Sequence, residues 1–271
     1  MAGATGRRET PGDGTLLLAV DVGNTNTVLG VFAGRDLRAN WRVTTRRDGT
    51  ADEYGILLRA LFEAAGIPLA SVGAVIVASV VPPLEGAVDG MCHQTVGRAP
   101  LWVGPGIKTG MPVLYDSPGD VGADRIVNAV AAFEQYGGPV IVVDFGTATT
   151  VDAVTARGEY LGGAIAPGIG ISADALFQRA ARLPRVDVAK PKSVIGRTTV
   201  QSIQAGLFYG YLGLVGEIVR RMKAELGGKG VVVATGGLSH LILGESDLVD
   251  RVDPLLTLTG LRILYERNTP R

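Results

Sequence analysis

The sequence has little of what marks a secreted, membrane-spanning or nucleic-acid-binding protein. Its 271 residues include a single cysteine, Cys92, which excludes an internal disulfide and any metal site built from several cysteines. No apolar run reaches the roughly eighteen residues that a membrane-spanning helix needs. Basic and acidic residues number 26 each, so no overall field favours nucleic acid or an anionic membrane as a partner.

What is present indicates a well-packed globular chain. Hydrophobic residues make up 46% of the sequence and charged residues 19%, and the length allows one large domain or two moderate ones. The opening MAGATGRRETPGDGT contains arginines but no long apolar signal core. We therefore predict a disordered tail over 1–14 and a cytoplasmic location for the chain.

One motif occurs twice, and its repetition favours two domains. DVGNTNTVLGV begins at Asp21 and DFGTATTVDAV begins at Asp144, and each acid closes a strongly apolar run. Glycine and small hydroxyl or amide residues follow soon after the acid in both copies. Aligned without a gap, the copies agree at Asp21/Asp144, Gly23/Gly146, Thr27/Thr150, Val28/Val151 and Val31/Val154.

The first half alternates strand and helix patterns in an order typical of a ribonuclease H-like unit. Short β-branched segments separated by Gly, Asn and Asp predict three strands in hairpins. A helix follows, with Thr50 or Asp52 as its cap and Gly66 as its end, and then a buried strand stopped by prolines and a second helix. The predicted strands cover 16–23, 26–32, 37–43, 73–83 and 99–104, and the helices 50–66 and 84–97.

The second half repeats this opening. A helix is predicted to begin near Asp120, ahead of a hairpin-rich stretch and a long apolar helix. The Gly- and Pro-rich stretch 105–118 is the expected boundary between an N-terminal domain over 15–117 and a C-terminal domain over 118–271. We predict an α/β fold of two ribonuclease H-like domains with a cleft between them. The later predicted strands cover 139–146, 149–160, 160–167 and 231–237, and the helices 119–138, 201–228 and the last part of 253–268.

An acid at the end of a buried strand, followed by a tight hairpin with glycine, has the chemistry of a phosphate site. Such a turn exposes backbone N–H groups that can wrap a phosphate. The ionised carboxylate only accepts hydrogen bonds, so it would hold Mg²⁺ or its waters beside the phosphate oxygens. Two such hairpins facing each other would clamp a polyphosphate. The alternative is that each hairpin contains turn residues and nothing more.

Several motifs occur in a fixed order along the chain: DVGNTNT, ASVVP, YDSPGDVGADR, VVDFGTATT, GGAIAPGI, IGRTTVQSIQAG, ATGG and LTLTGLRILYERN. Together they resemble the type III pantothenate kinases, within the superfamily of actin, sugar kinases and heat-shock ATPases. The likeness covers 16–268 and implies the duplicated actin-like ATPase fold. It also implies ATP-dependent phosphorylation of the primary hydroxyl of pantothenate, the first step toward coenzyme A.

The resemblance implies that both repeated motifs bind ATP. Asp21 would hold Mg²⁺, and Asp144 would hold the monovalent cation, K⁺ or NH₄⁺, that these enzymes need. Gly236 would lie against the adenine in a flat turn, although a Gly-Gly pair is also common in turns with no ligand. The implied ATP-binding residues are Asp21, Val22, Gly23, Asn24, Thr25, Asn26, Gly146, Thr147, Ala148, Thr149 and Gly236.

A second group of residues would bind pantothenate or take its proton. Asp124 lies in the first turn of its predicted helix, where the helix dipole favours a carboxylate, and the resemblance makes it the general base. The guanidinium of Arg125 would fork onto the carboxylate of pantothenate, or else form a surface ion pair with Glu134. The resemblance also implies that Tyr115, Gly122 and Thr199 line the pantothenate pocket.

The long segment 201–226 has too much apolar surface for a free helix. It either lies at the centre of the core or forms an interface between two chains. The resemblance favours a homodimer, with pantothenate and ATP as the other partners and no nucleic acid or membrane.

Two other functions fit the same architecture. A sugar or acyl kinase would differ in its acceptor pocket, and a carboxylate-bearing substrate suits Arg125 better than a neutral sugar does. A nucleotide-binding regulator, like an accessory transcription factor, is the alternative from a different class. The neutral charge and the absence of a basic stripe argue against contact with DNA.

Overall fold

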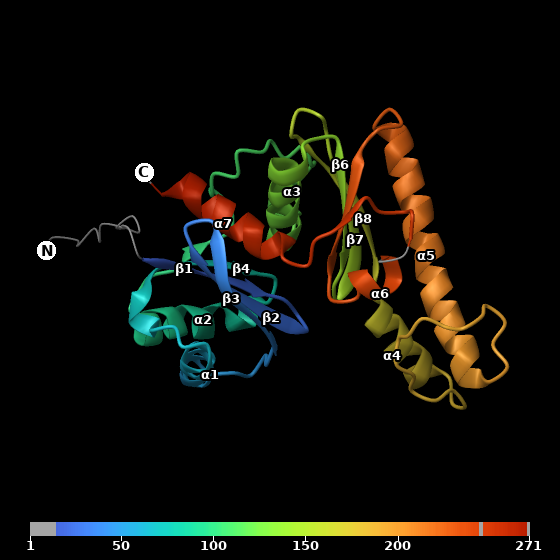
Figure 1. The fold of residues 1–271 in the computed structure, drawn as a ribbon, viewed down its shortest axis with the longest axis horizontal. Coiled ribbons are helices and arrows are strands. Elements are labelled where there is room, and N and C mark those ends of the chain that lie inside the picture. Colours follow the sequence, from blue (N-terminus) through green and yellow to red (C-terminus); the bar gives the residue numbers. More distant parts are fainter. Residues whose placement is uncertain (1–14, 244–245, 270–271) are drawn as a thin grey trace, which may run out of the picture. The chain divides into compact units, whose positions relative to one another are not determined.

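The computed structural model describes residues 15–243 and 246–269, so the tail predicted over 1–14 lies outside the described residues. The chain divides into two compact units, each with its own sheet and its own core (Figure 1). Unit 1 comprises Met1–Gly110, Gly122–Val127 and Thr257–Arg271, and unit 2 comprises Met111–Val121 and Asn128–Leu256.

Unit 1 contains a five-stranded sheet in the order β3-β2-β1-β4-β5. β1 lies at its centre, antiparallel to β2 and parallel to β4, and β2 pairs with β3 in a second hairpin. The three hairpin strands predicted from the sequence are therefore confirmed. The strands are β1 Leu16–Val22, β2 Asn26–Ala33, β3 Asp36–Thr44, β4 Val72–Ser79 and β5 Leu101–Trp102.

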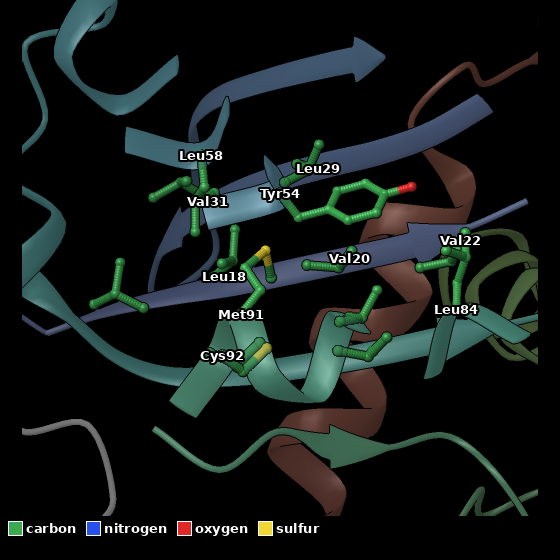
Figure 2. Packing of buried hydrophobic residues seen from close by; sticks show 14 of the residues in the cluster. Leu18, Val20, Val22, Leu29, Val31, Tyr54, Leu58, Leu84, Met91 and Cys92 are labelled. Atoms are coloured by element: carbon green, nitrogen blue, oxygen red, sulfur yellow. The ribbon is translucent and has the colours of Figure 1, made fainter. Parts of the chain in front are cut away.

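Two helices contribute to the core of unit 1. α1 (Ala51–Ala64) begins with a capping box, in which Thr50 and Glu53 satisfy each other's backbone N–H groups, so Thr50 is the cap. α2 (Glu85–Met91) continues into a π-helical turn, Cys92–Val96. Apolar side chains from these helices pack with those of the central strand β1 (Figure 2).

The single cysteine, Cys92, is fully buried in this core (Figure 2). Burial, with a smaller effect of the nearby Asp89 carboxylate, raises the pKa of its thiol to about 12. Because the thiolate is the reactive form of cysteine, Cys92 is a packing residue and not a nucleophile.

Unit 2 repeats the sheet order of unit 1. Its five strands run β10-β9-β6-β7-β8, with β6 at the centre, antiparallel to β7 and parallel to β9. β6 therefore corresponds to β1, β7 to β2 and β9 to β4, which confirms an α/β fold of two ribonuclease H-like halves. The strands are β6 Val140–Phe145, β7 Ala148–Val154, β8 Tyr160–Pro167, β9 Val231–Gly236 and β10 Arg251–Val252.

The long helix α5 (Thr199–Glu225) packs one side against the sheet of unit 2, where Phe208 and Val215 are buried. Tyr209, on another side, is 37% exposed, so only part of the apolar surface lies in the core. α4 (Ile169–Arg179), where no helix is predicted from the sequence, packs against α5, and the short α6 is Ser239–Leu243. No helix in the described part of the chain is long and apolar enough to cross a membrane.

The two compact units do not follow the single domain boundary predicted at residue 118, because parts of two later helices group with unit 1. The first turn of α3 (Ala123–Tyr136), which begins later than predicted, and all but the first residue of α7 (Leu256–Asn268) belong to unit 1. Close packing explains this grouping. A Cβ on Gly260 of α7 would lie only 2.3 Å from the backbone oxygen of Val127 in α3.

Candidate functional site

The first repeated motif forms the turn between β1 and β2 in unit 1. Asp21 is the penultimate residue of β1 and is partly exposed. Gly23 donates its N–H to the carbonyl oxygen of Asn26 at 3.1 Å, and a Cβ on Gly23 would lie 2.9 Å from that oxygen. A larger residue would therefore open the turn. Val22 is buried in the core, which leaves its backbone as the part that can reach a ligand.

Thr45, a residue that the sequence patterns do not single out, supports this turn from beneath. Its hydroxyl donates to the carbonyl oxygen of Gly23 at 2.7 Å and lies 2.9 Å from the hydroxyl of Thr27. Its backbone N–H donates to the carbonyl oxygen of Thr25 at 2.9 Å. Thr27 and Thr45 are both buried. These contacts fix the backbone of the turn on the side away from solvent.

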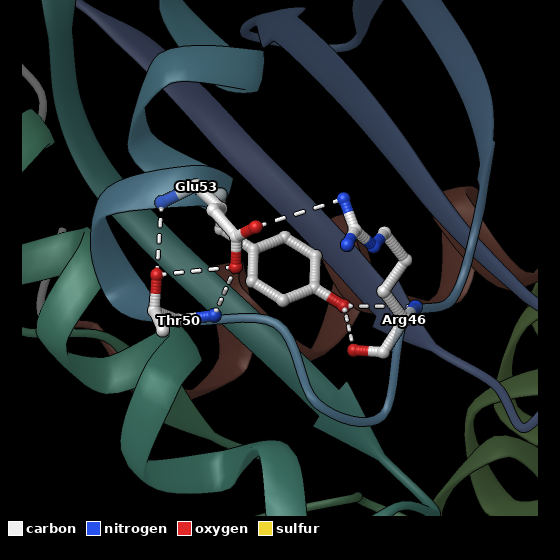
Figure 3. Close-up of polar contacts among 4 residues, drawn as sticks. Arg46, Thr50 and Glu53 are labelled. Atoms are coloured by element: carbon white, nitrogen blue, oxygen red, sulfur yellow. Dashed lines mark hydrogen bonds and ion pairs between the residues drawn. The ribbon is translucent and has the colours of Figure 1, made fainter.

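The segment after β3 also brings positive charge to the turn. Arg47 donates to Oδ1 of Asn24 at 2.8 Å. The carbonyl oxygen of Arg46 accepts from the hydroxyl of Tyr54 at 3.0 Å, and its guanidinium lies 3.6 Å from the carboxylate of Glu53 (Figure 3). Hydrogen bonds from the capping residue lower the pKa of Glu53, so this acid remains charged and helps to hold the segment.

The predicted base, Asp124, lies in the first turn of α3 and belongs to unit 1. A Cβ on Gly122 would lie 2.7 Å from Oδ1 of Asp124 and 3.8 Å from Cγ1 of Val80. Val80 donates its N–H to the carbonyl oxygen of Val22 at 3.1 Å. Gly122 and Asp124 therefore lie near the edge of the unit 1 sheet where β1 ends.

The geometry around Asp124 gives Gly122 and Arg125 physical roles. Glycine at 122 leaves the space that the carboxylate of Asp124 occupies. The backbone N–H of Arg125, the next residue, donates to Oδ1 of Asp124 at 2.8 Å. Arg125 is 7% exposed, so it is not an ordinary surface side chain.

The second repeated motif forms the turn between β6 and β7 in unit 2. Gly146 donates its N–H to the carbonyl oxygen of Ala148 at 3.0 Å. The carbonyl oxygen of Thr147 accepts from the N–H of Gly168 at 3.0 Å, and a Cβ on Gly168 would lie 2.1 Å from it. Glycine at 168 thus allows the start of α4 to pack directly on the turn.

Asp144 is the partly exposed acid of this second turn. Asn128 of α3 donates to its Oδ2 at 3.0 Å. Gly236, beside it at the end of β9, has a φ of 91°, and a Cβ there would lie 2.5 Å from Oδ1 of Asp144. Glycine at 236 therefore allows the end of β9 to lie directly against the Asp144 carboxylate and the backbone of Phe145. A partly exposed carboxylate is a suitable ligand for a cation.

The two turns differ in length, which corrects the ungapped alignment of the motifs. In unit 1 the residue opposite Val22 is Thr27, whereas in unit 2 the residue opposite Phe145 is Thr149. Thr149, and not Thr150, therefore corresponds to Thr27. Thr149 is 1% exposed, and among the described residues no hydrogen-bond partner of its hydroxyl is found. Its side chain lies beneath the turn, so only its backbone is placed to meet a phosphate.

Two of the residues predicted for the pantothenate pocket belong to unit 2. Tyr115 is 37% exposed, and its ring lies against Gly162 of β8, where a Cβ would be 3.1 Å from the ring carbons. Thr199, the first residue of α5, lines an open groove of about 360 Å³ between α4 and α5 together with Leu176 and Leu207. Gly122, Asp124 and Arg125 belong to unit 1.

The first turn suits a magnesium ion that a nucleotide helps to bind. Mg²⁺ in such sites is held by one or two carboxylates together with phosphate oxygens and waters. Asp21 offers one partly exposed carboxylate beside the first turn. Within the described residues, no group of three or more His, Cys, Asp and Glu side chains is placed to hold a metal ion by itself.

Comparisons with known proteins agree on one family. A family model for type III pantothenate kinase matches residues 17–221. A type III pantothenate kinase from Moorella thermoacetica is 59% identical over 254 residues, which cover 94% of this chain and 100% of the relative. One from Anaeromyxobacter dehalogenans is 60% identical over 253 residues, which cover 93% and 100%.

A likeness to solved structures shows the fold. A protein from Campylobacter jejuni, described as a conserved Baf family transcriptional activator, is 20% identical with a TM-score of 0.59, and the match covers 93% of this chain and 98% of that one. At this identity the match carries information about the fold and not about activity.

We predict that Thr45 stabilises the first turn through its hydroxyl. Thr45→Val keeps the shape but removes the donor to Gly23 and the partner of Thr27, so it should lower the free energy of unfolding by about 1–3 kcal/mol. Thr45→Ser, which keeps the hydroxyl, is the matched control and should lose less. Urea unfolding of the three proteins measures this difference. Equal stability of the Val and Ser variants would contradict the assignment.

Proposed function

This chain belongs to the type III pantothenate kinase family, and from that premise we propose which of its residues carry out the reaction. The activity is transfer of phosphate from ATP to the primary hydroxyl of pantothenate, which gives 4'-phosphopantothenate in coenzyme A biosynthesis. The observation that supports the assignment most directly is the position of Asp124. It is a carboxylate at a helix start, near the edge of the sheet where a phosphate-type turn begins.

Asp124 acts as the general base in this proposal. Its carboxylate accepts the proton of the pantothenate hydroxyl as that oxygen forms a bond to the γ-phosphorus of ATP, while the bond to the β-phosphate bridging oxygen breaks and ADP leaves. The amide dipoles at the start of α3 favour a negative charge at this position. Gly122 leaves room for it, since any side chain there would collide with Oδ1.

The remaining predicted residues bind and orient the substrates. Arg125 pairs with the carboxylate of pantothenate, and its burial strengthens such a pair because solvent is excluded. Tyr115 and Thr199 complete the pantothenate pocket. The two turns bind the phosphates of ATP with their backbone N–H groups, and Gly236 lies against the adenine. When bound, Mg²⁺ neutralises phosphate charge, with Asp21 as the residue that would hold it.

We propose that Asp144 holds the monovalent cation. Two features support this assignment: the carboxylate is partly exposed, and Asn128 orients it through a hydrogen bond to Oδ2. A cation there would place positive charge beside the second turn. The cytoplasmic location expected from the sequence stays a prediction, which fractionation of cells that express a tagged chain would test.

The activity is tested by measuring ADP formation that depends on pantothenate. We expect the wild-type chain to be active and Asp124→Asn to lose turnover by about 10²–10⁴-fold with little change in ATP affinity, because only the proton acceptor is removed. Asp120→Asn, at an exposed acid just before the same helix, is the control and should keep full activity.

Other outcomes of this assay point to the alternatives. ATP binding with no pantothenate-dependent ADP formation by the wild-type chain would favour a nucleotide-binding regulator. Faster turnover with glucose or acetate than with pantothenate would favour a different acceptor. Full turnover of Asp124→Asn would remove Asp124 from the proposed mechanism.

We predict that activity depends on K⁺ or NH₄⁺ through Asp144. Replacing K⁺ by choline at constant ionic strength should lower the wild-type turnover by about tenfold, which corresponds to ~1.4 kcal/mol of lost stabilisation. Asp144→Asn keeps an oxygen for the hydrogen bond from Asn128 but loses the charge. This variant should be slow in both salts. A normal response of Asp144→Asn to K⁺ would place the cation elsewhere.

We propose that the chain forms a homodimer through unit 2. Exposed apolar side chains occur on successive elements of unit 2, with Ile165 on β8 64% exposed and Phe177 on α4 46% exposed. Large exposed apolar surfaces of this kind are characteristic of protein interfaces. Further exposed apolar residues on β8, α4, α5 and the segment between the two helices are Leu161, Ile171, Leu176, Val194, Ile195, Val200 and Tyr209.

A charge on this surface should separate the two chains. We expect light scattering to give the mass of two chains for the wild type and of one chain for Ile165→Glu, with turnover falling alongside. Ile56→Glu on α1 is the matched control, since Ile56 is 66% exposed but belongs to unit 1. A wild-type monomer, or a monomeric variant with full turnover, would disprove the proposed role of the dimer.

A further inference from the structure

A buried tyrosine–carboxylate pair lies within the sheet of unit 2, outside the residues assigned to the reaction. Tyr160, the first residue of β8, is 0% exposed, and Asp152 on β7 is 1% exposed. The hydroxyl of Tyr160 donates to Oδ1 of Asp152 at 2.7 Å. Burying a carboxylate is costly unless it is hydrogen-bonded, so this pair needs an explanation.

The backbone of Tyr160 holds the segment that carries Tyr115. Its N–H donates to the carbonyl oxygen of Pro112 at 2.9 Å, and its carbonyl oxygen accepts from the N–H of Leu114 at 2.8 Å. Val113 forms an isolated parallel bridge with Tyr160. Two backbone hydrogen bonds therefore fix the chain immediately before Tyr115 to the residue whose side chain is anchored on Asp152.

The adjacent glycines of YLGG allow both contacts. Gly162 has a φ of 113°, and a Cβ there would lie 3.1 Å from the ring of Tyr115. A Cβ on Gly163 would lie 2.8 Å from Oδ1 of Asp152 and 2.0 Å from the carbonyl oxygen of Val151. One strand thus supports the ring of Tyr115 at one glycine and makes room for the Asp152 carboxylate at the next.

We propose that Asp152 and Tyr160 are positioning residues for the pantothenate pocket. Asp152 fixes the side chain of Tyr160, Tyr160 fixes the backbone before Tyr115, and Gly162 provides the surface on which the ring of Tyr115 rests. The pair touches no substrate in this proposal and acts through Tyr115. The inference rests on the proposed function, in which Tyr115 binds pantothenate.

Tyr160→Phe tests the proposal, because it removes only the hydroxyl that bonds Asp152. The KM for pantothenate should rise roughly tenfold, since a binding group displaced by a fraction of an ångström loses much of its effect, while kcat and the KM for ATP change little. Asp152→Asn should shift the same constant and serves as a second variant if Tyr160→Phe folds poorly.

The matched control is Tyr136→Phe. Tyr136 also donates its hydroxyl to a carboxylate in unit 2, that of Asp253, at 3.2 Å. Burial and this neighbouring carboxylate raise the pKa of Tyr136, so the bond is of the same kind. The hydroxyl of Tyr136 bonds to Asp253, whereas the segment before Tyr115 is held by Tyr160. Tyr136→Phe should therefore leave the pantothenate KM unchanged.

A double-mutant cycle with Tyr115→Ala separates positioning from general stability. If Tyr160 acts through Tyr115, Tyr160→Phe should not raise the pantothenate KM any further in the Tyr115→Ala background. Additive effects, an unchanged KM in the single variant, or equal changes in both KM values would overturn the inference. A wild-type chain that forms no ADP with pantothenate would instead reject the proposed function. A normal KM in Tyr115→Ala would reject the role of Tyr115 and this inference with it.

Discussion

The structure depends on one constraint, that an acid is the penultimate residue of the central strand of each sheet. β1 and β6 are paired on both sides, with an antiparallel neighbour on one side and a parallel neighbour on the other. Such a strand is buried along most of its length, so a carboxylate without a dedicated hydrogen-bond partner in the core is favoured near the end of the strand, where it can reach solvent. The apolar run followed by Asp and Gly therefore sets both the fold and the position of the charge.

Local patterns predicted the elements that depend on local physics. β1, β2 and β3 were recognisable because short apolar strands alternate with turn residues, and α1 because Thr50 or Asp52 could cap it and Gly66 could end it. Asp124 was placed correctly in a first helical turn, although α3 begins later than predicted. Assignment of the substrate-binding residues came from the family resemblance and stays a prediction for each residue.

What the sequence did not predict depends on pairing between distant residues. The support that Thr45 gives to Gly23 depends on how β2 pairs with β3, which no local pattern states. The difference in turn length appears only in the strand register, and it moves the counterpart of Thr27 from Thr150 to Thr149. α4 was missed in a segment where Ile169 is buried but Ile171, Leu176 and Phe177 are exposed, so burial of its apolar residues depends on its packing against α5.

The domain division shows the same limit at a larger scale. α7 ends the chain in sequence but groups with unit 1, where Gly260 approaches the backbone of Val127 and Leu258 lies against Gly30. A boundary drawn once along a linear sequence cannot describe a unit assembled from three separate segments. The two halves share the same sheet order, but the turn after the central strand is one residue shorter in unit 2 than in unit 1.

The burial of Cys92 makes the protein well suited to site-specific labelling. Its thiol is the single one in the sequence and is almost entirely protonated at neutral pH. The native chain should therefore react only slowly with maleimide dyes. A cysteine introduced at an exposed position such as Asp48, in the segment after β3, would then carry the fluorophore alone. Nucleotide binding at the first turn could be followed optically without first removing a native cysteine.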